Sequence, residues 1–249
     1  RGSEELVNSN PDNKKKNPMY QRIWTMVYSF LMFILVRNAV QYALLALLYQ
    51  LAQSGATGGL VDLLILRDET GAYNGYSGDV SSIIAALGFI GGALAVWSTA
   101  KLLITKNKED MHLSHLKKEG KAKYALLVAV TIGAVIGFNL LFELLGVTNK
   151  SEAYTEVVSQ QYSAHFIVGI LVFGFISPIA EELLFRGVIY GYLRRFMDLK
   201  LAIALSALIF GVYHMNYVQG IYGFLIGCLM AYALSLIHIS EPTRPISIS

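Results

Sequence analysis

Long stretches of apolar residues, each about as long as a membrane-crossing helix, constrain the fold of this chain most. A helix needs roughly 20 apolar residues to cross about 30 Å of hydrocarbon, and these stretches are about 17 to 28 residues long. Only 15% of the residues are charged, whereas soluble domains carry about 25%. The sequence therefore predicts an all-α fold: a polytopic membrane helical bundle with about six transmembrane helices. The predicted spans are residues 23–51, 80–105, 124–145, 163–180, 199–214 and 217–233.

The first stretch is longer than one membrane thickness and is interrupted by Arg37 and Asn38. Either it forms one long tilted helix with Arg37 facing the bundle, or an interfacial helix precedes a shorter span. Glu143 is another charge inside the predicted N-terminal spans. Charged side chains in a membrane usually face the bundle interior. Arg37 and Glu143 could therefore pair with polar groups of the bundle or line a cavity, and the sequence does not assign either a role.

The connections between the stretches alternate in charge. The connection at 60–79 holds one Arg and four acidic residues, and the next connection is rich in lysine. By the positive-inside rule, we expect a cytoplasmic N-terminus. We also expect a multi-pass protein of a bacterial cell membrane, with the lipid bilayer as a partner. The net charge of +3 lies in short runs beside apolar stretches, so we expect no nucleic acid partner. The single cysteine, Cys228, allows no intrachain disulfide.

The two ends of the chain differ from the rest. Residues 1–22 form a polar N-terminal tail, residues 23–162 hold the N-terminal membrane helices, and residues 163–233 hold the candidate catalytic core. Residues 234–245 read LSLIHISEPTRP and look like the in-frame translation of a sequencing adapter. We expect residues 234–249 to be an adapter-derived artefact, and His238 to have no functional role.

Two adjacent carboxylates, Glu181 and Glu182, lie at the end of a predicted span. Each costs roughly 2.5 to 3.5 kcal/mol on insertion scales, so a compensating role is expected. Arg186 follows Glu182 by four residues, one helical turn, and can pair with it and keep it ionised. Glu181 is rotated by about 100° from Glu182, which leaves it free to hold a water molecule or to accept a proton.

His214 stands near the end of the next apolar stretch. A short polar connection joins the two stretches into an antiparallel hairpin, which places Glu181 and His214 at similar depth. A carboxylate and an imidazole could then meet across the hairpin. Such a pair can activate water, with the Glu as general base and the His polarising a carbonyl or donating a proton. Taken alone, the acidic cluster could also be an interfacial ion pair, and His214 an interfacial histidine.

These residues resemble the motifs of a known family. EELLFR at 181–186 is similar to the E-E-x-x-x-R motif of the CPBP intramembrane proteases, which include type II CAAX prenyl endopeptidases and bacteriocin-processing enzymes. FGVYH at 210–214 matches their F-x-x-x-H motif. The two motifs follow on successive apolar stretches in the family's order, and the resemblance covers about residues 163–233.

The resemblance implies hydrolysis of a peptide bond in a membrane-associated protein or peptide. By position, Glu181 would activate water, Glu182 and Arg186 would support it, and His214 would bind water or stabilise the oxyanion. The family also has, on a later helix, a His followed four residues on by Asn or a similar residue. This chain lacks that third motif, because His238 is followed by Pro242, so we expect the chain as it stands to be inactive.

The sequence does not decide whether the protein uses a metal cofactor. Glu181, Glu182 and His214 are candidate ligands for a divalent metal such as zinc. The H-E-x-x-H signature of zinc proteases is absent, and a catalytic zinc site needs three protein ligands. A metal-free mechanism with a glutamate-activated water is at least as well supported.

Two other classes of protein also fit the intramembrane charges. One is a non-catalytic binding or bacteriocin-immunity protein of the same fold. The other is a transporter, which would be expected to show an internal repeat or paired broken helices, and the sequence has neither. The remaining histidines read as surface residues: His112 and His115 lie in the lysine-rich connection, and His165 lies at the outer end of its helix.

Overall fold

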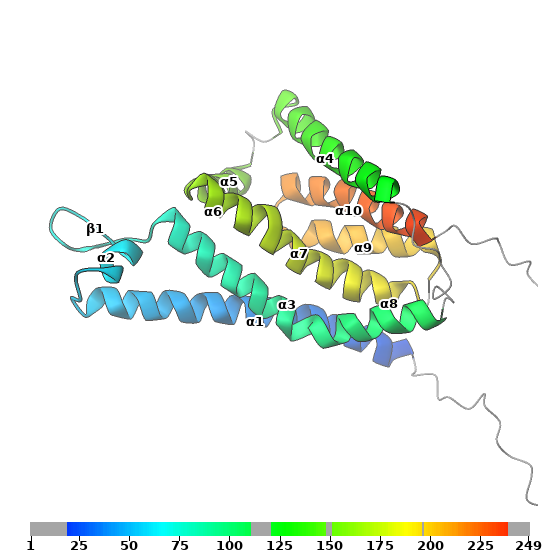
Figure 1. Ribbon diagram of the computed structural model, residues 1–249, viewed down its shortest axis with the longest axis horizontal. Coiled ribbons are helices and arrows are strands. Elements are labelled where there is room, and N and C mark those ends of the chain that lie inside the picture. Colours follow the sequence, from blue (N-terminus) through cyan, green and yellow to red (C-terminus); the bar gives the residue numbers. More distant parts are fainter. Residues whose placement is uncertain (1–18, 111–120, 148–150, 196, 239–249) are drawn as a thin grey trace, which may run out of the picture.

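The computed structural model describes residues 19–110, 121–147, 151–195 and 197–238 (Figure 1). Within these residues the fold is an all-α membrane bundle, as predicted. The longer helices are α1 (Met19–Gln53), α3 (Gly78–Asp110), α4 (Lys121–Leu144), α9 (Leu199–Tyr213) and α10 (Tyr217–His238).

A further helix of five consecutive segments runs without a break from Phe166 to Leu193, and we call it the central helix. Its segments are α6 (Phe166–Gly169), η3 (Ile170–Ile176), α7 (Ser177–Glu182), η4 (Leu183–Tyr190) and α8 (Gly191–Leu193). The stretch predicted to end at residue 180 thus continues as a helix to Leu193. The reason is that the following residues are mostly apolar and buried, and that Glu182 pairs with Arg186 inside the helix.

Each of the six predicted stretches coincides with a helix. Among the described residues, three helices are long and apolar enough to cross a membrane: Ile23–Gln53, Gly78–Thr105 and Phe166–Leu193. Shorter apolar stretches are Val128–Leu144, Leu199–Tyr213 and Tyr217–Met230. The first stretch is one continuous helix, α1, whose 35 residues extend roughly 50 Å at 1.5 Å per residue.

The connection between α1 and α3 contains elements that apolar patterning does not reveal. It holds the short helix α2 (Leu60–Leu64) and an antiparallel pair of strands, β1 (Leu66–Arg67) and β2 (Tyr73–Gly75). Asp68 closes the turn between the strands, because its carboxylate accepts hydrogen bonds from the hydroxyl and backbone N–H of Thr70 and from the N–H of Ala72. These hydrogen bonds hold the pKa of the Asp68 carboxyl below its ordinary value. The amphipathic helix α5 (Glu152–Tyr162) precedes the central helix.

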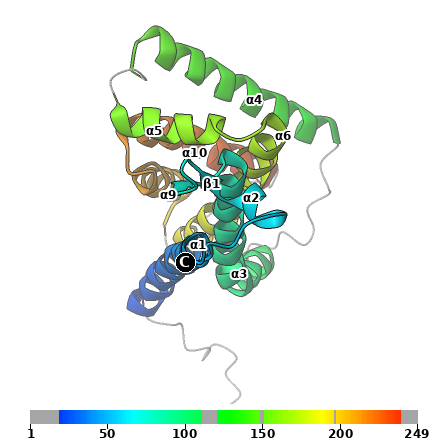
Figure 2. The same cartoon turned by 90° about the vertical axis from the view of Figure 1, so that its left-hand side faces the viewer.

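The central helix lies in the middle of the bundle. Its second half packs against α3 and α1 on one side and α9 on the other, while α10 packs against α9 and α4 packs against α10. Figures 1 and 2 both show α4 at the edge of the bundle farthest from α1. Glu181, Glu182 and Arg186 therefore lie on the helix with neighbours on both sides.

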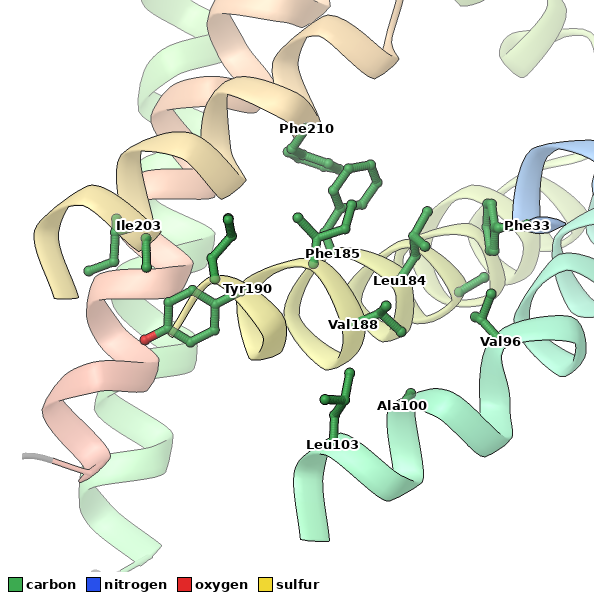
Figure 3. Packing of buried hydrophobic residues seen from close by; sticks show 14 residues of the cluster. Phe33, Val96, Ala100, Leu103, Leu184, Phe185, Val188, Tyr190, Ile203 and Phe210 are labelled. Carbon is green, nitrogen blue, oxygen red and sulfur yellow. The ribbon is translucent and has the colours of Figure 1, made fainter. Parts of the chain in front are cut away.

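The core is formed around the second half of the central helix. Leu184, Phe185 and Val188 are fully buried there. Figure 3 shows Phe185 beside Phe210 of α9, with Val188 facing α3. Because the lipid is as apolar as these side chains, close packing rather than hydrophobicity holds such helices together. This packing fixes the rotation of the central helix and hence the direction in which Glu181 and Glu182 point.

Candidate active site

The two candidate carboxylates lie at the end of α7, between two π-helical segments. η3 and η4 contain seven and eight residues, and they flank the single α-helical segment that carries Glu181 and Glu182. π-helices are rare and occur frequently at functional sites. Pro178 at the start of α7 lacks the N–H that would continue the hydrogen-bond ladder, which is consistent with a change of helical register here.

Glu182 forms the ion pair expected from its spacing. Its Oε2 lies 3.3 Å from Nε of Arg186, whose side chain is only 8% exposed, against 35% for Glu182. The guanidinium also stacks over Phe210, with Cζ 5.0 Å from the ring centroid, and Nη2 donates to the carbonyl of Gly227 at 3.4 Å. Nη1 is buried without a hydrogen-bond partner among the described residues. Arg186 therefore connects the central helix to α9 and α10.

Glu181 lies outside that ion pair. It is half-buried, and its Oε1 accepts a hydrogen bond from the hydroxyl of Ser177 at 3.4 Å, one turn earlier. No ion pair joins Glu181 to a basic side chain in the part of the chain that the structure describes. The carboxylate thus keeps accepting capacity for a water molecule.

His214 caps the C-terminal end of α9 and is half-buried. Its ring packs edge-on against Phe210 and Tyr213, with centroid distances of 4.8 and 5.4 Å. Nδ1 lies 2.8 Å from the carbonyl oxygen of Phe210. Because a carbonyl only accepts, Nδ1 carries the hydrogen, and the neutral ring has its lone pair on Nε2.

Glu181 and His214 make no hydrogen bond or ion pair with each other among the described contacts. They are linked indirectly. The ring of Phe210 contacts both the Arg186 guanidinium and the His214 ring. The charge of Arg37, on α1, interacts electrostatically with both Glu181 and His214.

The described residues do not fit a three-ligand metal centre. No group of three or more His, Cys, Asp or Glu side chains is placed to hold a metal ion among them. Glu181, Glu182 and His214 therefore do not form the ligand set of a catalytic zinc ion as they stand.

The remaining residues considered from the sequence lie elsewhere. His112 and His115 are outside the described residues, and the helix α10 reaches His238, whose side chain is also outside them. Glu143 is exposed near the end of α4.

His165 is exposed, as expected, but sequence patterning missed its partner. Its backbone N–H donates to Oδ1 of Asp79 at 2.7 Å, and its ring Nδ1 lies 2.5 Å from Oδ2. This contact joins the start of the central helix to the start of α3.

Sequence reasoning also missed two contacts at the site. Ser177 could have been found, because it precedes Glu181 by one helical turn. Arg37 donates a hydrogen bond to the hydroxyl of Tyr213, 176 positions later in the chain. Its position inside a membrane span was the available signal, but nothing in the sequence identified its partner.

Comparison with known proteins agrees with the motifs. The family model described as type II CAAX prenyl endopeptidase Rce1-like matches residues 163–238, which include Glu181, Glu182, Arg186 and His214. The match confirms the resemblance to the CPBP intramembrane proteases for this part of the chain. It supports protease activity of the intramembrane CAAX type in general. No curated protein and no solved structure matches the chain.

Proposed function

We propose that this protein is an intramembrane endopeptidase that hydrolyses a peptide bond of a membrane-associated protein or peptide. One observation carries the proposal. Within the family-matched region, Glu181 lies outside the Glu182–Arg186 ion pair, and His214 has its free lone pair on Nε2. A carboxylate outside an ion pair and an unprotonated imidazole nitrogen are the groups that hydrolysis by an activated water requires.

In the proposed reaction, the Glu181 carboxylate accepts a proton from a water molecule. The oxygen of that water adds to the carbonyl carbon of the scissile peptide bond. His214 Nε2 accepts the water's second hydrogen bond and so orients it. When the C–N bond breaks, Glu181 returns its proton to the leaving amine. Arg186 keeps Glu182 ionised through their ion pair.

The substrate partner in this proposal is a membrane-associated peptide or protein. A prenylated C-terminal tail, a leader peptide and a membrane-bound precursor all have the required chemistry. We further propose a multi-pass location in a bacterial cell membrane, with the N-terminus in the cytoplasm and no nucleic acid partner.

A second candidate function is binding without hydrolysis, as in a bacteriocin-immunity protein of the same fold. The lack of a direct contact between Glu181 and His214 among the described residues favours it. The two candidates differ in a single outcome, since both bind the peptide and only the protease releases two products.

The test is a cleavage assay in lipid nanodiscs with prenylated and unprenylated membrane peptides, read by mass spectrometry. It compares two versions of the protein. The first is the 249-residue chain, and in the second, residues 234–249 are replaced by the residues that the source genome encodes after codon 233. We expect the second version to cleave, and the first to cleave much less because the third motif is absent.

Glu181→Gln should lower the cleavage rate about 10²- to 10⁴-fold, the usual contribution of a general base, and His214→Ala should also lower it strongly. The matched control is Glu143→Gln, which removes an exposed carboxylate from another membrane helix and should leave the rate unchanged. A Glu181→Gln variant that cleaves at the unmodified rate would rule out the proposed base. Peptide binding without cleavage by either version would favour the binding function.

A further inference from the structure

Arg37 is a positive charge near the midpoint of the membrane helix α1. An arginine at this depth costs about 2.5 to 3.5 kcal/mol on insertion scales, so a compensating interaction is expected. No ion pair joins Arg37 to a carboxylate in the described part of the chain. Its interactions with aromatic side chains therefore need an explanation.

The guanidinium of Arg37 is held against Tyr213 at the end of α9. Nη1 donates a hydrogen bond to the Tyr213 hydroxyl oxygen, and Cζ lies 5.5 Å from the centroid of the same ring and 5.1 Å from that of Phe89. The backbone of α1 is also fixed here, because a Cβ at Gly88 of α3 would lie only 2.9 Å from the Arg37 carbonyl oxygen. The contact between Arg37 and Tyr213 thus joins α1, which packs closely against α3, to the end of α9.

Tyr213 in turn belongs to the surroundings of the proposed catalytic residues. It directly precedes His214, its ring lies 5.4 Å from the His214 ring, and it lies 5.2 Å from the ring of Phe185 on the central helix. Because the Tyr213 oxygen accepts from Arg37, its own hydrogen stays available to donate to another group. The charge of Arg37 also interacts with Glu181 and His214.

We infer that Arg37 is a positioning residue of the active site proposed above, acting through Tyr213 to hold the His214 end of α9 against the central helix. The inference rests on the proposed function for its catalytic meaning. It extends the site beyond the family-matched residues 163–238 to α1, in the N-terminal part of the chain. An arginine suits this role, because its several donors and its planar face can engage a hydroxyl and aromatic rings together.

The first test uses the 249-residue chain in lipid nanodiscs with ¹⁵N-labelled histidine, read by NMR. The His214 signals are assigned by their loss in His214→Gln. We expect Arg37→Met and Tyr213→Phe each to move the His214 ring signals, and the double variant to move them no further than the larger single change, as for residues acting in one contact. Arg37→Lys, which keeps a charged donor, should move them less.

Lys101→Met is the matched control, since it removes a positive charge from an exposed position on a membrane helix, and it should leave the His214 signals in place. Unchanged His214 signals in Arg37→Met and Tyr213→Phe would overturn the inference, and so would additive shifts in the double variant. If Arg37→Met does not fold, Tyr213→Phe and Arg37→Lys decide, because they keep the ring and the charge respectively.

The second test is kinetic and separates this inference from the proposed function. In the cleaving version of the protein, Arg37→Met should lower kcat about 10- to 100-fold with KM changed by less than about twofold, as expected when a catalytic group is misplaced. Arg37→Lys should restore part of kcat. Loss of cleavage in Glu181→Gln together with an unchanged kcat in Arg37→Met would refute the role of Arg37 alone. Full activity in Glu181→Gln would refute the proposed function, and with it the catalytic meaning of the contact.

Discussion

The central helix and α4 are both apolar helices of one membrane protein, yet their surroundings differ. The second half of the central helix is buried, with Leu184, Phe185 and Val188 fully so. Among the described side chains of α4, only Phe142 is buried, and α4 packs against α10 at the edge of the bundle (Figure 2). Apolar composition therefore does not decide which helix lies inside.

The difference between the two helices follows from the interactions that a lipid bilayer favours. Lipid tails satisfy an apolar side chain as well as a protein neighbour does, so position depends on close packing and on polar groups that lipid cannot satisfy. The central helix carries Glu181, Glu182 and Arg186, which find partners inside the bundle. In α4 the described polar contacts join uncharged groups, such as the 3.3 Å hydrogen bond from Asn139 to the Tyr222 hydroxyl. The charged residues therefore explain the central position.

The largest effect on stability is expected from truncating Phe185. Its ring is fully buried and packs edge-on against Phe210 at 4.8 Å and Phe30 at 6.3 Å. Phe185→Ala should lower the free energy of unfolding by about 3 to 5 kcal/mol, measured by denaturation in mixed micelles. The control is Leu140→Ala on α4, where the side chain is 56% exposed and a change within about 0.5 kcal/mol is expected. Equal losses in both variants would contradict the contrast between the two helices.

A smaller effect is expected where α9 and α10 approach each other. A Cβ at Gly211 would lie 2.6 Å from the backbone carbonyl oxygen of Gly220, so the helices must shift to accept one. Gly211→Ala should lower the free energy of unfolding by about 1 to 3 kcal/mol.

Gly137 on α4 offers the opposite case. A Cβ there meets nothing within 4 Å, so Gly137→Ala should be neutral or stabilise by about 0.5 to 1 kcal/mol through helix propensity. Thermal unfolding of Gly211→Ala and Gly137→Ala under the same conditions measures the difference in stability. Destabilisation by Gly137→Ala would show that α4 packs more tightly than its surroundings indicate.

Much of the architecture could be predicted from the sequence, because the length of an apolar stretch and the spacing of charges are local properties. The six stretches coincide with helices, and the four-residue spacing of Glu182 and Arg186 correctly indicated their ion pair. The hairpin of the central helix and α9 also follows from a short polar connection.

Other features could not be predicted, because they depend on groups distant in the chain or on backbone hydrogen bonding. The π-helical segments η3 and η4 have the same apolar composition that an α-helix would have. Arg37 and Tyr213 are separated by most of the chain, so only the folded structure reveals their contact. The peripheral place of α4 is likewise invisible, since its sequence is as apolar as a central helix requires.

The smallest loss of stability is expected from neutralising Glu182, the charge that distinguishes the central helix most directly. Removing one partner of a buried ion pair typically costs about 3 to 5 kcal/mol, because it leaves the other charge uncompensated. Arg186 is 8% exposed, but Glu182 is 35% exposed, so solvent screens part of the interaction. Glu182→Gln should therefore lower the free energy of unfolding by about 1 to 2 kcal/mol in mixed micelles.

The exposed Glu143 on α4 provides the comparison, and Glu143→Gln should change the free energy of unfolding by less than about 0.5 kcal/mol. Adding Arg186→Met to Glu182→Gln should recover part of the lost stability, since no uncompensated charge then remains. If the double variant is instead less stable by the sum of the two single losses, the guanidinium acts through its stacking on Phe210 and its bond to Gly227 rather than through the ion pair. The position of the central helix would then depend on packing alone, and its charges would be needed for the proposed chemistry only.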